Sequence, residues 1–256
     1  MDLALTDKVV FVAGSSRGIG RGIASVFMDE GAKVMLSGRS GDDLERTCRE
    51  LSAGRTERVA SFAGDLSDAE MALAAHRAIV DRWGKVDVLV CNVGSGTGPG
   101  GWQLTVEDWN RVFQINLWAT VRLVEVFLPG MAEVRSGNIL FISSIAGHES
   151  LGAPLPYSAA KAALEKYSKD LSHKVAKTGV RVNCIAPGNI LFPGGTWQQK
   201  LDKDAKGVNT MIERDVPAGR FGTPEEIGAA AAFLASERAS FINGASLVVD
   251  GGQTRA

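Results

Sequence analysis

The sequence contains few cysteines and few histidines. Cys48, Cys91 and Cys184 are widely spaced and form no CxxC pair, and none of the three histidines lies at metal-ligand spacing from them. This set argues against both a disulfide framework and a zinc site. We therefore expect reduced thiols that fill the core, no bound metal, and an intracellular protein.

The chain also lacks an excess of charge of either sign. It has 28 Lys and Arg against 29 Asp and Glu, a formal net charge of −1. Without a basic stripe, long-range attraction to nucleic acid or to anionic membranes is not expected. No run approaches the ~20 apolar residues of a membrane span, and residues 1–6 lack the pattern of a secretion signal. We expect a cytoplasmic location, with no nucleic-acid or membrane partner.

What the sequence does contain is an alternation of strand-like and helix-like segments. Strand-like apolar runs fall near residues 8–13, 33–37, 58–63, 86–91, 137–143, 180–186 and 245–249. Helix-like segments fall near residues 18–30, 41–53, 67–83, 105–134, 155–178 and 223–236. The alternation predicts an α/β fold, a single Rossmann-type doubly wound domain over residues 1–256 with a seven-stranded parallel sheet and helices on both faces. A ligand crevice is expected at the carboxyl ends of the strands, where the order switches between the first and fourth.

The first strand-like run leads into a glycine-rich loop and then into a helix. The loop, residues 14–20, has the glycine spacing Gly-x3-Gly-x-Gly. Glycines allow a tight turn and a close approach of the backbone to a pyrophosphate, and the helix N-terminus supplies free N–H groups and a partial positive charge. Strand, loop and helix together predict a dinucleotide site. The loop residues expected to face the cofactor are Gly14, Ser16, Arg17, Gly18, Ile19 and Gly20.

A tyrosine and a lysine lie four residues apart in Ala-rich, helix-like sequence. Tyr157 and Lys161 therefore share one helix face, and the ammonium favours the phenolate of a tyrosine whose ordinary pKa is about 10. Ser144, thirteen residues before Tyr157, ends an apolar run and is placed to bond a carbonyl or alcohol oxygen. Ser143 is the rival serine. A lone Tyr-x3-Lys pair more often lies on a solvated helix face, so the argument depends on the other motifs.

These motifs in order resemble the classical short-chain dehydrogenases/reductases. The glycine loop, the Ser–Tyr–Lys set and residues 91–94, 187–190 and 250–252 each match a segment of that family. The resemblance covers nearly the whole chain, from about Thr6 to Gly252. It implies hydride transfer between a nicotinamide and a ketone or secondary alcohol, and the nearest substrate class is that of the 3-oxoacyl-carrier-protein reductases.

The resemblance also implies roles for single residues. Tyr157 is the acid/base, and Lys161 lowers its pKa and holds the nicotinamide ribose. Ser144 bonds the substrate oxygen. Asn116 keeps a water in a proton relay, although a buried structural Asn is an equally good interpretation. The irregular segment 191–216 is the implied substrate lid. The remaining residues implied to bind the cofactor are Ser37, Arg39, Asp65, Leu66, Asn92, Gly94, Pro187, Gly188 and Ile190.

The end of the second strand bears on the choice of nicotinamide. NAD sites usually place an acidic residue there for the ribose 2′-OH, whereas this chain has Ser37 and then Arg39. Arg39 and Arg17 suit a 2′-phosphate, because guanidinium pairs with phosphate in charge-assisted hydrogen bonds. We predict NADP(H); the alternative is that Arg39 points to solvent and Ser37 tolerates either cofactor. Asp65 matches the family position that holds the adenine, or is a turn residue before the next helix.

Several features have two interpretations. Phe192 replaces a Thr of the family, so a hydroxyl contact to the cofactor carboxamide is lost or supplied elsewhere. The glycine-rich loop 94–102 is either mobile beside the cofactor or an exposed connector. His148 lies near the expected site, where a structural role is favoured over substrate contact. His76 and His173 are expected on the surface.

Three functions of different kinds stay open. The first is an NADP-dependent reductase of a ketone or β-ketoacyl group. The second is an alcohol dehydrogenase of a sugar, steroid or polyol, whose ring Trp102, Trp197 and Gln198 would contact. The third is a non-catalytic dinucleotide-binding regulator, against which the intact catalytic set argues. A homotetramer is expected through the segments that resemble the family's contact surfaces, residues 105–134, 155–178 and 241–249.

Overall fold

The strand-like segments form one parallel sheet. The computed structural model describes residues 2–52 and 54–255, and the strand order is β3-β2-β1-β4-β5-β6-β7 with every neighbouring pair parallel. The strands are β1 (Val9–Ala13), β2 (Lys33–Gly38), β3 (Val59–Ala63), β4 (Val88–Cys91), β5 (Gly137–Ile142), β6 (Val180–Pro187) and β7 (Ser246–Val249). The predicted sheet is confirmed, and the chain crosses to the other side of β1 when it forms β4, as expected.

The strands read as continuous apolar runs because they are covered on both faces. Every residue of β1 and of β4 is buried. Parallel sheets occur almost only where helices hide both faces, so both sets of alternating side chains must be apolar. β-branched residues such as Val9, Val10 and Val12 also favour the extended backbone.

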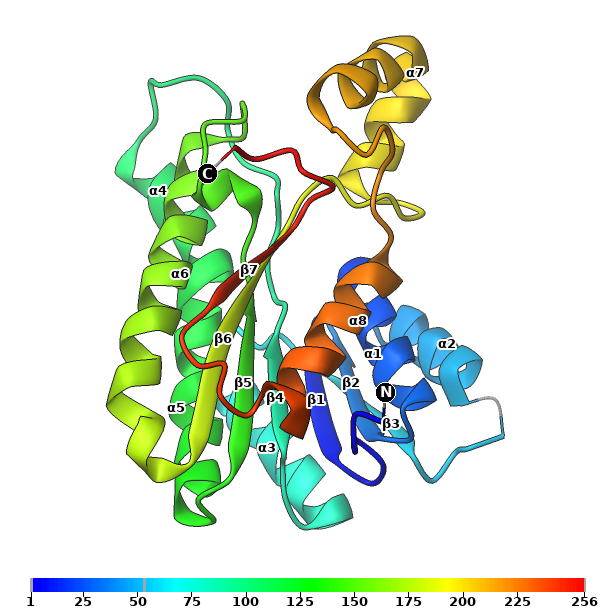
Figure 1. The fold of residues 1–256 in the computed structure, drawn as a ribbon, viewed down its shortest axis with the longest axis vertical. Coiled ribbons are helices and arrows are strands. Elements are labelled where there is room, and N and C mark those ends of the chain that lie inside the picture. The colour runs from blue at the N-terminus through cyan, green and yellow to red at the C-terminus, as the bar shows by residue number, and fades with distance from the viewer. Residues whose placement is uncertain (1, 53, 256) are drawn as a thin grey trace.

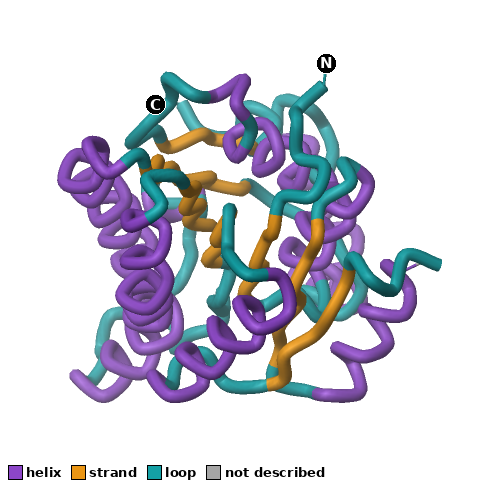
Figure 2. The backbone as a smooth tube through the Cα atoms, turned by 90° about the horizontal axis from the view of Figure 1, so that it is seen from below, coloured by secondary structure: helices purple, strands orange, loops and turns teal. Residues whose placement is uncertain are grey.

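Helices cover both faces of this sheet (Figures 1 and 2). Helices α1, α2 and α8 share one core with the sheet, and α3, α5 and α6 share the other. The helices are α1 (Gly18–Asp29), α2 (Gly41–Ser52), α3 (Ala69–Trp83), α4 (Val106–Phe113), α5 (Ala119–Glu133), α6 (Leu155–Val175), α7 (Thr196–Asp215) and α8 (Pro224–Ala235), with the short helices η1 (Gln114–Trp118), η2 (Ile145–Gly147), η3 (Ala176–Thr178) and η4 (Glu237–Ala239). Ala53, the last residue of the predicted helix 41–53, lies outside the described residues.

The segment 191–216 is not irregular, as the sequence suggested, because it contains α7. Within α7, Asp204 has non-helical angles of φ −152° and ψ 75°. Its Oδ1 accepts a hydrogen bond from the backbone N–H of Gly207 at 2.9 Å. An Asp that accepts from the third residue after it is an N-cap, so α7 is two helical segments joined at Asp204. The helix was not predicted because its surface is polar and the break at Asp204 interrupts its apolar period.

The predicted helix 105–134 is confirmed over Val106–Glu133 but contains the π-helical turn η1. This helix of 28 residues, in which a stretch of 18 has a mean hydropathy of 1.2, is long and apolar enough to cross a membrane by length and composition. Its apolar side chains are partly core side chains, because Leu123, Val124 and Phe127 are buried against the sheet. The core helix of a globular fold gives the same pattern.

Aromatic side chains fill the core on the α5 face of the sheet. Phe11 of β1 and Phe127 of α5 stack with their ring centroids 5.2 Å apart. Burial of each such ring contributes about 1.5–3 kcal/mol. His76 meets Phe127 edge-on at 4.9 Å and is half-buried, so its predicted surface position is wrong, and burial lowers its pKa. His173 is exposed, as predicted.

The cysteines are free thiols, as expected. Cys91 and Cys184 are buried, and Cys48 is partly buried beside the core. Burial raises the pKa of all three thiols, that of Cys184 to about 12. They are therefore neutral and unreactive near neutral pH.

Candidate active site

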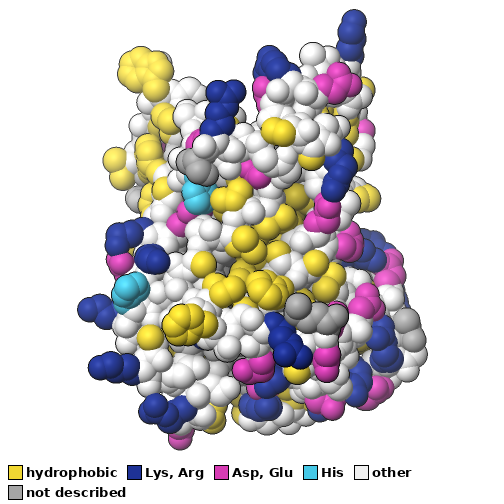
Figure 3. Space-filling view, viewed as in Figure 1, with side chains coloured by type: hydrophobic (Ala, Val, Ile, Leu, Met, Phe, Trp, Pro, Cys, Tyr) yellow, Lys and Arg dark blue, Asp and Glu magenta, His cyan; other side chains and the backbone are white. Residues whose placement is uncertain are grey.

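The carboxyl ends of the strands open into one large cleft of about 1790 Å³. It lies between the loop after β4 and α7, which form the two projections at the top of Figure 3. Gly20 and Pro187, both predicted to bind cofactor, are buried and do not line it. The predicted residues that do line it are Gly14, Ser16, Arg17, Gly18, Ile19, Ser37, Arg39, Asp65, Leu66, Asn92, Gly94, Asn116, Ser144, Tyr157, Lys161, Gly188 and Ile190.

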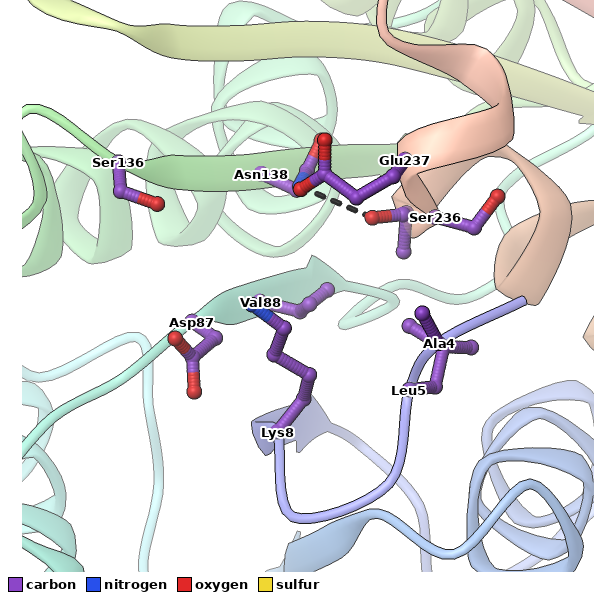
Figure 4. Close-up of a pocket in the computed structure, with 10 residues that line it drawn as sticks. Ala4, Leu5, Lys8, Asp87, Val88, Ser136, Asn138, Ser236 and Glu237 are labelled. Atoms are coloured by element: carbon purple, nitrogen blue, oxygen red, sulfur yellow. Dashed lines mark hydrogen bonds between the residues drawn. The ribbon is translucent and has the colours of Figure 1, made fainter. Parts of the chain in front are cut away.

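A second cavity, at the opposite end of the sheet, is too small for a substrate (Figure 4). Its volume is about 20 Å³, and Lys8, Asp87 and Asn138 are among the residues around it. The amide N–H of Asn138 donates to the carbonyl of Ala235 at 3.0 Å. Its Oδ1 is buried and has no partner among the described residues. The cavity has room for one water molecule, so the large cleft is the candidate site.

The glycine loop is held in shape by side chains from the two strands beside it. The N–H of Gly14 donates to Oγ of Ser37 at 3.0 Å, and Nδ2 of Asn92 donates to the carbonyl of Gly14 at 2.8 Å. A Cβ at Gly20 would lie 2.3 Å from that same carbonyl oxygen. Gly20 is therefore required beneath the loop. Ser37 and Asn92, predicted as cofactor ligands, have side chains that support the loop.

The N-terminus of α1 faces the cleft without a side-chain cap. Its N-cap, Arg17, has an extended backbone and makes no capping hydrogen bond. The first N–H groups of an uncapped helix are free to bind an anion. Gly18, with φ +58°, lies against the ring of Phe192, which a Cβ there would approach to 2.7 Å. Phe192 thus contacts the glycine loop from the segment that leads to α7.

The rim of the cleft beside β2 is basic. Arg17 and Arg39 are exposed and line the cleft, and β2 ends without a carboxylate. Asp65 accepts from the N–H of Ser67 at 2.9 Å. This bond lowers the pKa of Asp65, and the charge of Arg39 adds to the effect. Asp65 thus makes a turn before α3, whose N-cap is Asp68. Asp65 also lines the cleft, and its role at the adenine stays a prediction.

Tyr157 lies in the first turn of α6, and both Tyr157 and Ser144 line the cleft. Ser144 is the N-cap of η2 and accepts from the N–H of Ala146 at 3.2 Å. Burial raises the pKa of Tyr157, and the hydrogen bond with Ser144 opposes that rise. The expectation that Lys161 lowers this pKa is not met in this structure, where Nζ of Lys161 is 5.8 Å from the centre of the phenol ring.

Lys161 is buried next to the end of β5. It is 5% exposed, and its Nζ donates to the carbonyl of Ile142 at 2.8 Å. Burial lowers its pKa to about 8, because a low-dielectric surrounding disfavours the charged form. Ser143, the rival serine, is buried and donates to the backbone carbonyl of Lys161 at 3.1 Å. Ser143 therefore supports the helix with its hydroxyl. Both serines line the cleft, and the choice of Ser144 as the substrate ligand stays a prediction.

Asn116 joins the π-helical turn to the loop after β4. Its Oδ1 accepts from the N–H of Ser95 at 3.0 Å, and its Nδ2 donates to the carbonyls of Ser95 and Val112. A Cβ at Gly94 would lie 2.9 Å from Oδ1 of Asn116 and 3.3 Å from Nζ of Lys161. Gly94 thus brings Asn116 close to Lys161. The π turn, a feature frequent at functional sites, turns Asn116 toward the cleft.

The C-terminal segment also lines the cleft, which we did not predict from the sequence. Asp250 accepts from the N–H groups of Gly252 at 2.9 Å and Thr254 at 2.7 Å, and Glu149 accepts from the N–H of Arg255 at 2.6 Å. The Asp-Gly-Gly turn signature was the available signal. His148 contacts Glu165 and does not line the cleft. Cleft residues that the sequence did not single out include Ser95, Ile145, Glu149, Leu151, Asn189, Gln253 and Arg255.

A doubly wound sheet, a glycine loop and a Ser–Tyr–Lys set around one cleft define a nicotinamide-dependent oxidoreductase of the short-chain type. The family model described as enoyl-(acyl carrier protein) reductase matches residues 13–254. The chain belongs to the short-chain dehydrogenase/reductase family, as the motifs indicated.

Characterised relatives differ in substrate. The chain is 36% identical to a 3-oxoacyl-[acyl-carrier-protein] reductase of Chlamydia muridarum, over 98% of this chain and 99% of that protein. It is 34% identical to the D-threitol dehydrogenase of Mycolicibacterium smegmatis, over 99% and 95% of the two chains. A crystal structure of L-sorbose reductase from Gluconobacter frateurii with NADPH and L-sorbose superposes with a TM-score of 0.93, at 34% identity over all of both chains.

Proposed function

We propose that this protein is an NADP(H)-dependent reductase of a ketone, working reversibly on the corresponding secondary alcohol. The observation that carries the proposal is that Ser144, Tyr157 and Lys161 line the same cleft as the glycine loop. A half-buried phenol that shares the cleft with a serine hydroxyl is suited to exchange a proton with a substrate oxygen. A dinucleotide-binding regulator has no need of such a pair.

The described residues fit an NADP(H) molecule. The free N–H groups at the start of α1 suit the pyrophosphate, and Arg17 and Arg39 on the basic rim suit a 2′-phosphate. Gly18 lines the cleft without a side chain between the backbone and the cofactor, and Gly20 beneath it lets the loop turn tightly. Bound NADPH would supply the hydride in reduction, and bound NADP⁺ would accept it in oxidation. NADPH is also the cofactor in the L-sorbose reductase crystal.

The protein's own part in the reaction is to orient the substrate and move a proton. In reduction, Ser144 donates a hydrogen bond to the carbonyl oxygen, where negative charge develops. The phenol of Tyr157 gives its proton to that oxygen. Lys161, buried and held by the carbonyl of Ile142, orients the ribose and contributes positive charge. Asn116 fixes the backbone beside Lys161 through Ser95, which is the structural role that the sequence left open, and a relay to solvent through Asn116 stays a prediction.

A polyhydroxylated substrate, a ketose or polyol, is the second candidate beside a 3-oxoacyl group. Nδ2 of Asn189 and Oε1 of Gln253 are buried with no hydrogen-bond partner among the described residues, and both residues line the cleft. Unpaired buried polar atoms cost free energy, and a turn of these two side chains toward the cleft would let substrate hydroxyls pair with them. L-sorbose reductase and D-threitol dehydrogenase, both similar to this chain, are named for such compounds.

The proposal also includes the substrate lid, the homotetramer and the cytoplasmic location that the sequence predicts. Residues 191–216, with α7, form a lid over the substrate, and the break at Asp204 lets its two halves turn separately. A homotetramer is proposed because Trp118, Phe241 and Leu247, on two of the segments predicted as contacts, expose large apolar side chains. The location proposed is cytoplasmic.

An activity panel tests the proposal. NADPH or NADH is offered with a 3-oxoacyl thioester, a cyclic ketone and L-sorbose, and NADP⁺ with D-threitol, while nicotinamide absorbance is followed. We expect turnover of at least one pair, faster with NADPH than with NADH. Tight NADPH binding without turnover on a broad carbonyl panel would favour the regulator. Preference for the sugar over the thioester would select the second candidate.

A further inference from the structure

Helix α7, the main part of the proposed lid, depends on its two ends for its position. It stands at the top of Figure 1, joined to the rest of the molecule by the segment after β6 and the segment before α8. Most of its residues are exposed. Within the described part of the chain, no other helix or strand packs extensively against it. Contacts at the two connecting segments must therefore hold α7 in place.

The segment after β6 ends in a tight turn, residues 192–195. The N–H of Gly195 donates to the carbonyl of Phe192 at 3.0 Å. Pro193 and Gly194, which has φ +71°, occupy the two central positions, a combination typical of a type II turn. Gly195 is the N-cap of α7. Because proline also fixes one backbone angle of the turn, α7 begins at a stiff connection.

The ring of Phe192 lies between the start of α1 and the start of α7. A Cβ at Gly18 would approach Cε2 and Cζ of this ring to 2.7 Å, and a Cβ at Gly195 would approach the same atoms to 2.8 Å. The ring edge thus fills the space that a side chain of either residue would need. Phe192 also packs against the core shared by α1 and α8. A Cβ at Gly194 would lie 3.6 Å from Nη1 of Arg17, so the turn lies against the glycine loop.

The other end of α7 is attached elsewhere. The N–H of Ala218 donates to the carbonyl of Gly251 at 3.0 Å, in the C-terminal turn. The ring of Phe221 lies 5.6 Å from that of Trp197, which joins the segment after α7 to its first turn. These contacts hold the lid to the C-terminal segment and close its two ends on each other. The contact with the glycine loop is made by the turn 192–195.

We propose that Phe192 is a positioning residue whose ring pins the start of the lid to the glycine loop. The inference rests on the lid function proposed above for residues 191–216. A ring that fills the space over Gly18 and Gly195 fixes α7 relative to the loop proposed to hold the cofactor. A threonine, which the family resemblance places here, is too short to span both glycines. Loss of the ring therefore weakens substrate binding more than the chemical step.

A double-substitution cycle tests the contact without substrate or cofactor. Gly195 has φ −77°, which alanine adopts without strain, so the new methyl group of Gly195→Ala acts on the ring of Phe192. Hydrogen exchange of the backbone amides of residues 196–203 is expected to be about tenfold faster in Gly195→Ala. In the Phe192→Ala background, which has room for the methyl group, the same substitution changes exchange by less than about twofold.

The cycle has an internal control. Any change in helix capping at Gly195 is the same in both backgrounds, so it cancels from the comparison. An equal effect of Gly195→Ala with and without the ring of Phe192 would overturn the proposal.

Variants of Phe192 itself separate positioning from stability. In Phe192→Ala we expect faster exchange over residues 196–203 and a KM for the carbonyl substrate about tenfold higher, with kcat within about twofold of the wild type. Phe192→Met, an apolar side chain of similar reach, restores most of both, whereas Phe192→Thr behaves like Phe192→Ala. Phe233→Ala is the matched control, because Phe233 is a partly buried ring of α8 that packs against the same core and does not line the cleft.

Two results with the single variants would contradict the proposal. If Phe192→Ala and Phe233→Ala lower the free energy of unfolding alike and both leave lid exchange and KM unchanged, the ring of Phe192 is purely structural. If Phe192→Thr tightens NADPH binding while lid exchange stays slow, the position serves the cofactor directly. If no carbonyl is reduced, the exchange cycle still decides the point independently of the proposed function.

Discussion

The inner floor of the cleft and its outer wall are built in opposite ways. The floor, which we define as Gly14, Asn92, Asn116 and Lys161, is bound by hydrogen bonds within the protein. The wall, which we define as Arg17, Arg39 and α7, is mostly exposed. The comparison teaches that the fold fixes the residues around the proposed chemistry before a ligand binds. The residues proposed to recognise the 2′-phosphate and the substrate are exposed, and the ligand itself would position them.

The difference has a physical reason. A proton donor must be held within tenths of an ångström of the reacting atom, so its supports are buried and fully paired. A long arginine that pairs with a phosphate tolerates movement, because the charge itself supplies the attraction. Changes to the floor should therefore lower turnover or stability, and changes to the wall should alter preference. Three substitutions test this division.

The largest effect is expected at the phenol beside the floor. Tyr157→Phe removes the proton donor and leaves the ring in place. We expect kcat to fall by about a thousandfold, within the usual range for general acid–base catalysis, with the dissociation constant for NADPH nearly unchanged. Stopped-flow turnover and fluorescence titration measure the two quantities. Near-normal turnover would refute the role of Tyr157.

The second-largest effect is expected at Arg39, in the wall. Arg39→Asp replaces an attraction for the 2′-phosphate by a repulsion. The ratio of kcat/KM for NADPH to that for NADH should fall by about a hundredfold, since a hydrogen bond to a charged group is worth about 1.5–3 kcal/mol. Arg46→Asp, an exposed arginine of α2 that pairs with Asp43, controls for charge alone. An unchanged ratio would mean that Arg39 points to solvent.

The smallest effect is expected inside the floor itself. In Gly94→Ala the new Cβ meets Oδ1 of Asn116 at 2.9 Å and Nζ of Lys161 at 3.3 Å. Overpacking of this kind costs about 1–3 kcal/mol, so the free energy of unfolding should fall by that amount. We also expect a lower kcat, because the new methyl group displaces Asn116 or Lys161. Gly96→Ala, two residues away, meets nothing within 4 Å and should be nearly neutral. Equal behaviour of the two variants in urea unfolding would count against a rigid floor.

The fold was predictable to the extent that local patterns report it. The buried strands had to be apolar on both faces, and the glycine loop had to begin a helix, so both were readable in the chain. Helix α7 was not, because its surface is polar and Asp204 interrupts its periodicity. The contact between His76 and Phe127 was not readable either, since a lone histidine in helical sequence gives no sign of what it packs against.

The sequence by itself determined the class of chemistry, because Ser144, Tyr157 and Lys161 stand at fixed intervals on local elements. Only the tertiary structure decided which side chains work as supports. Ser37 and Asn92 hold the glycine loop through hydrogen bonds, and Ser143 supports α6 by donating to the backbone carbonyl of Lys161. Those relations join residues far apart in the chain or depend on burial, and burial is a property of packing that no local interval encodes.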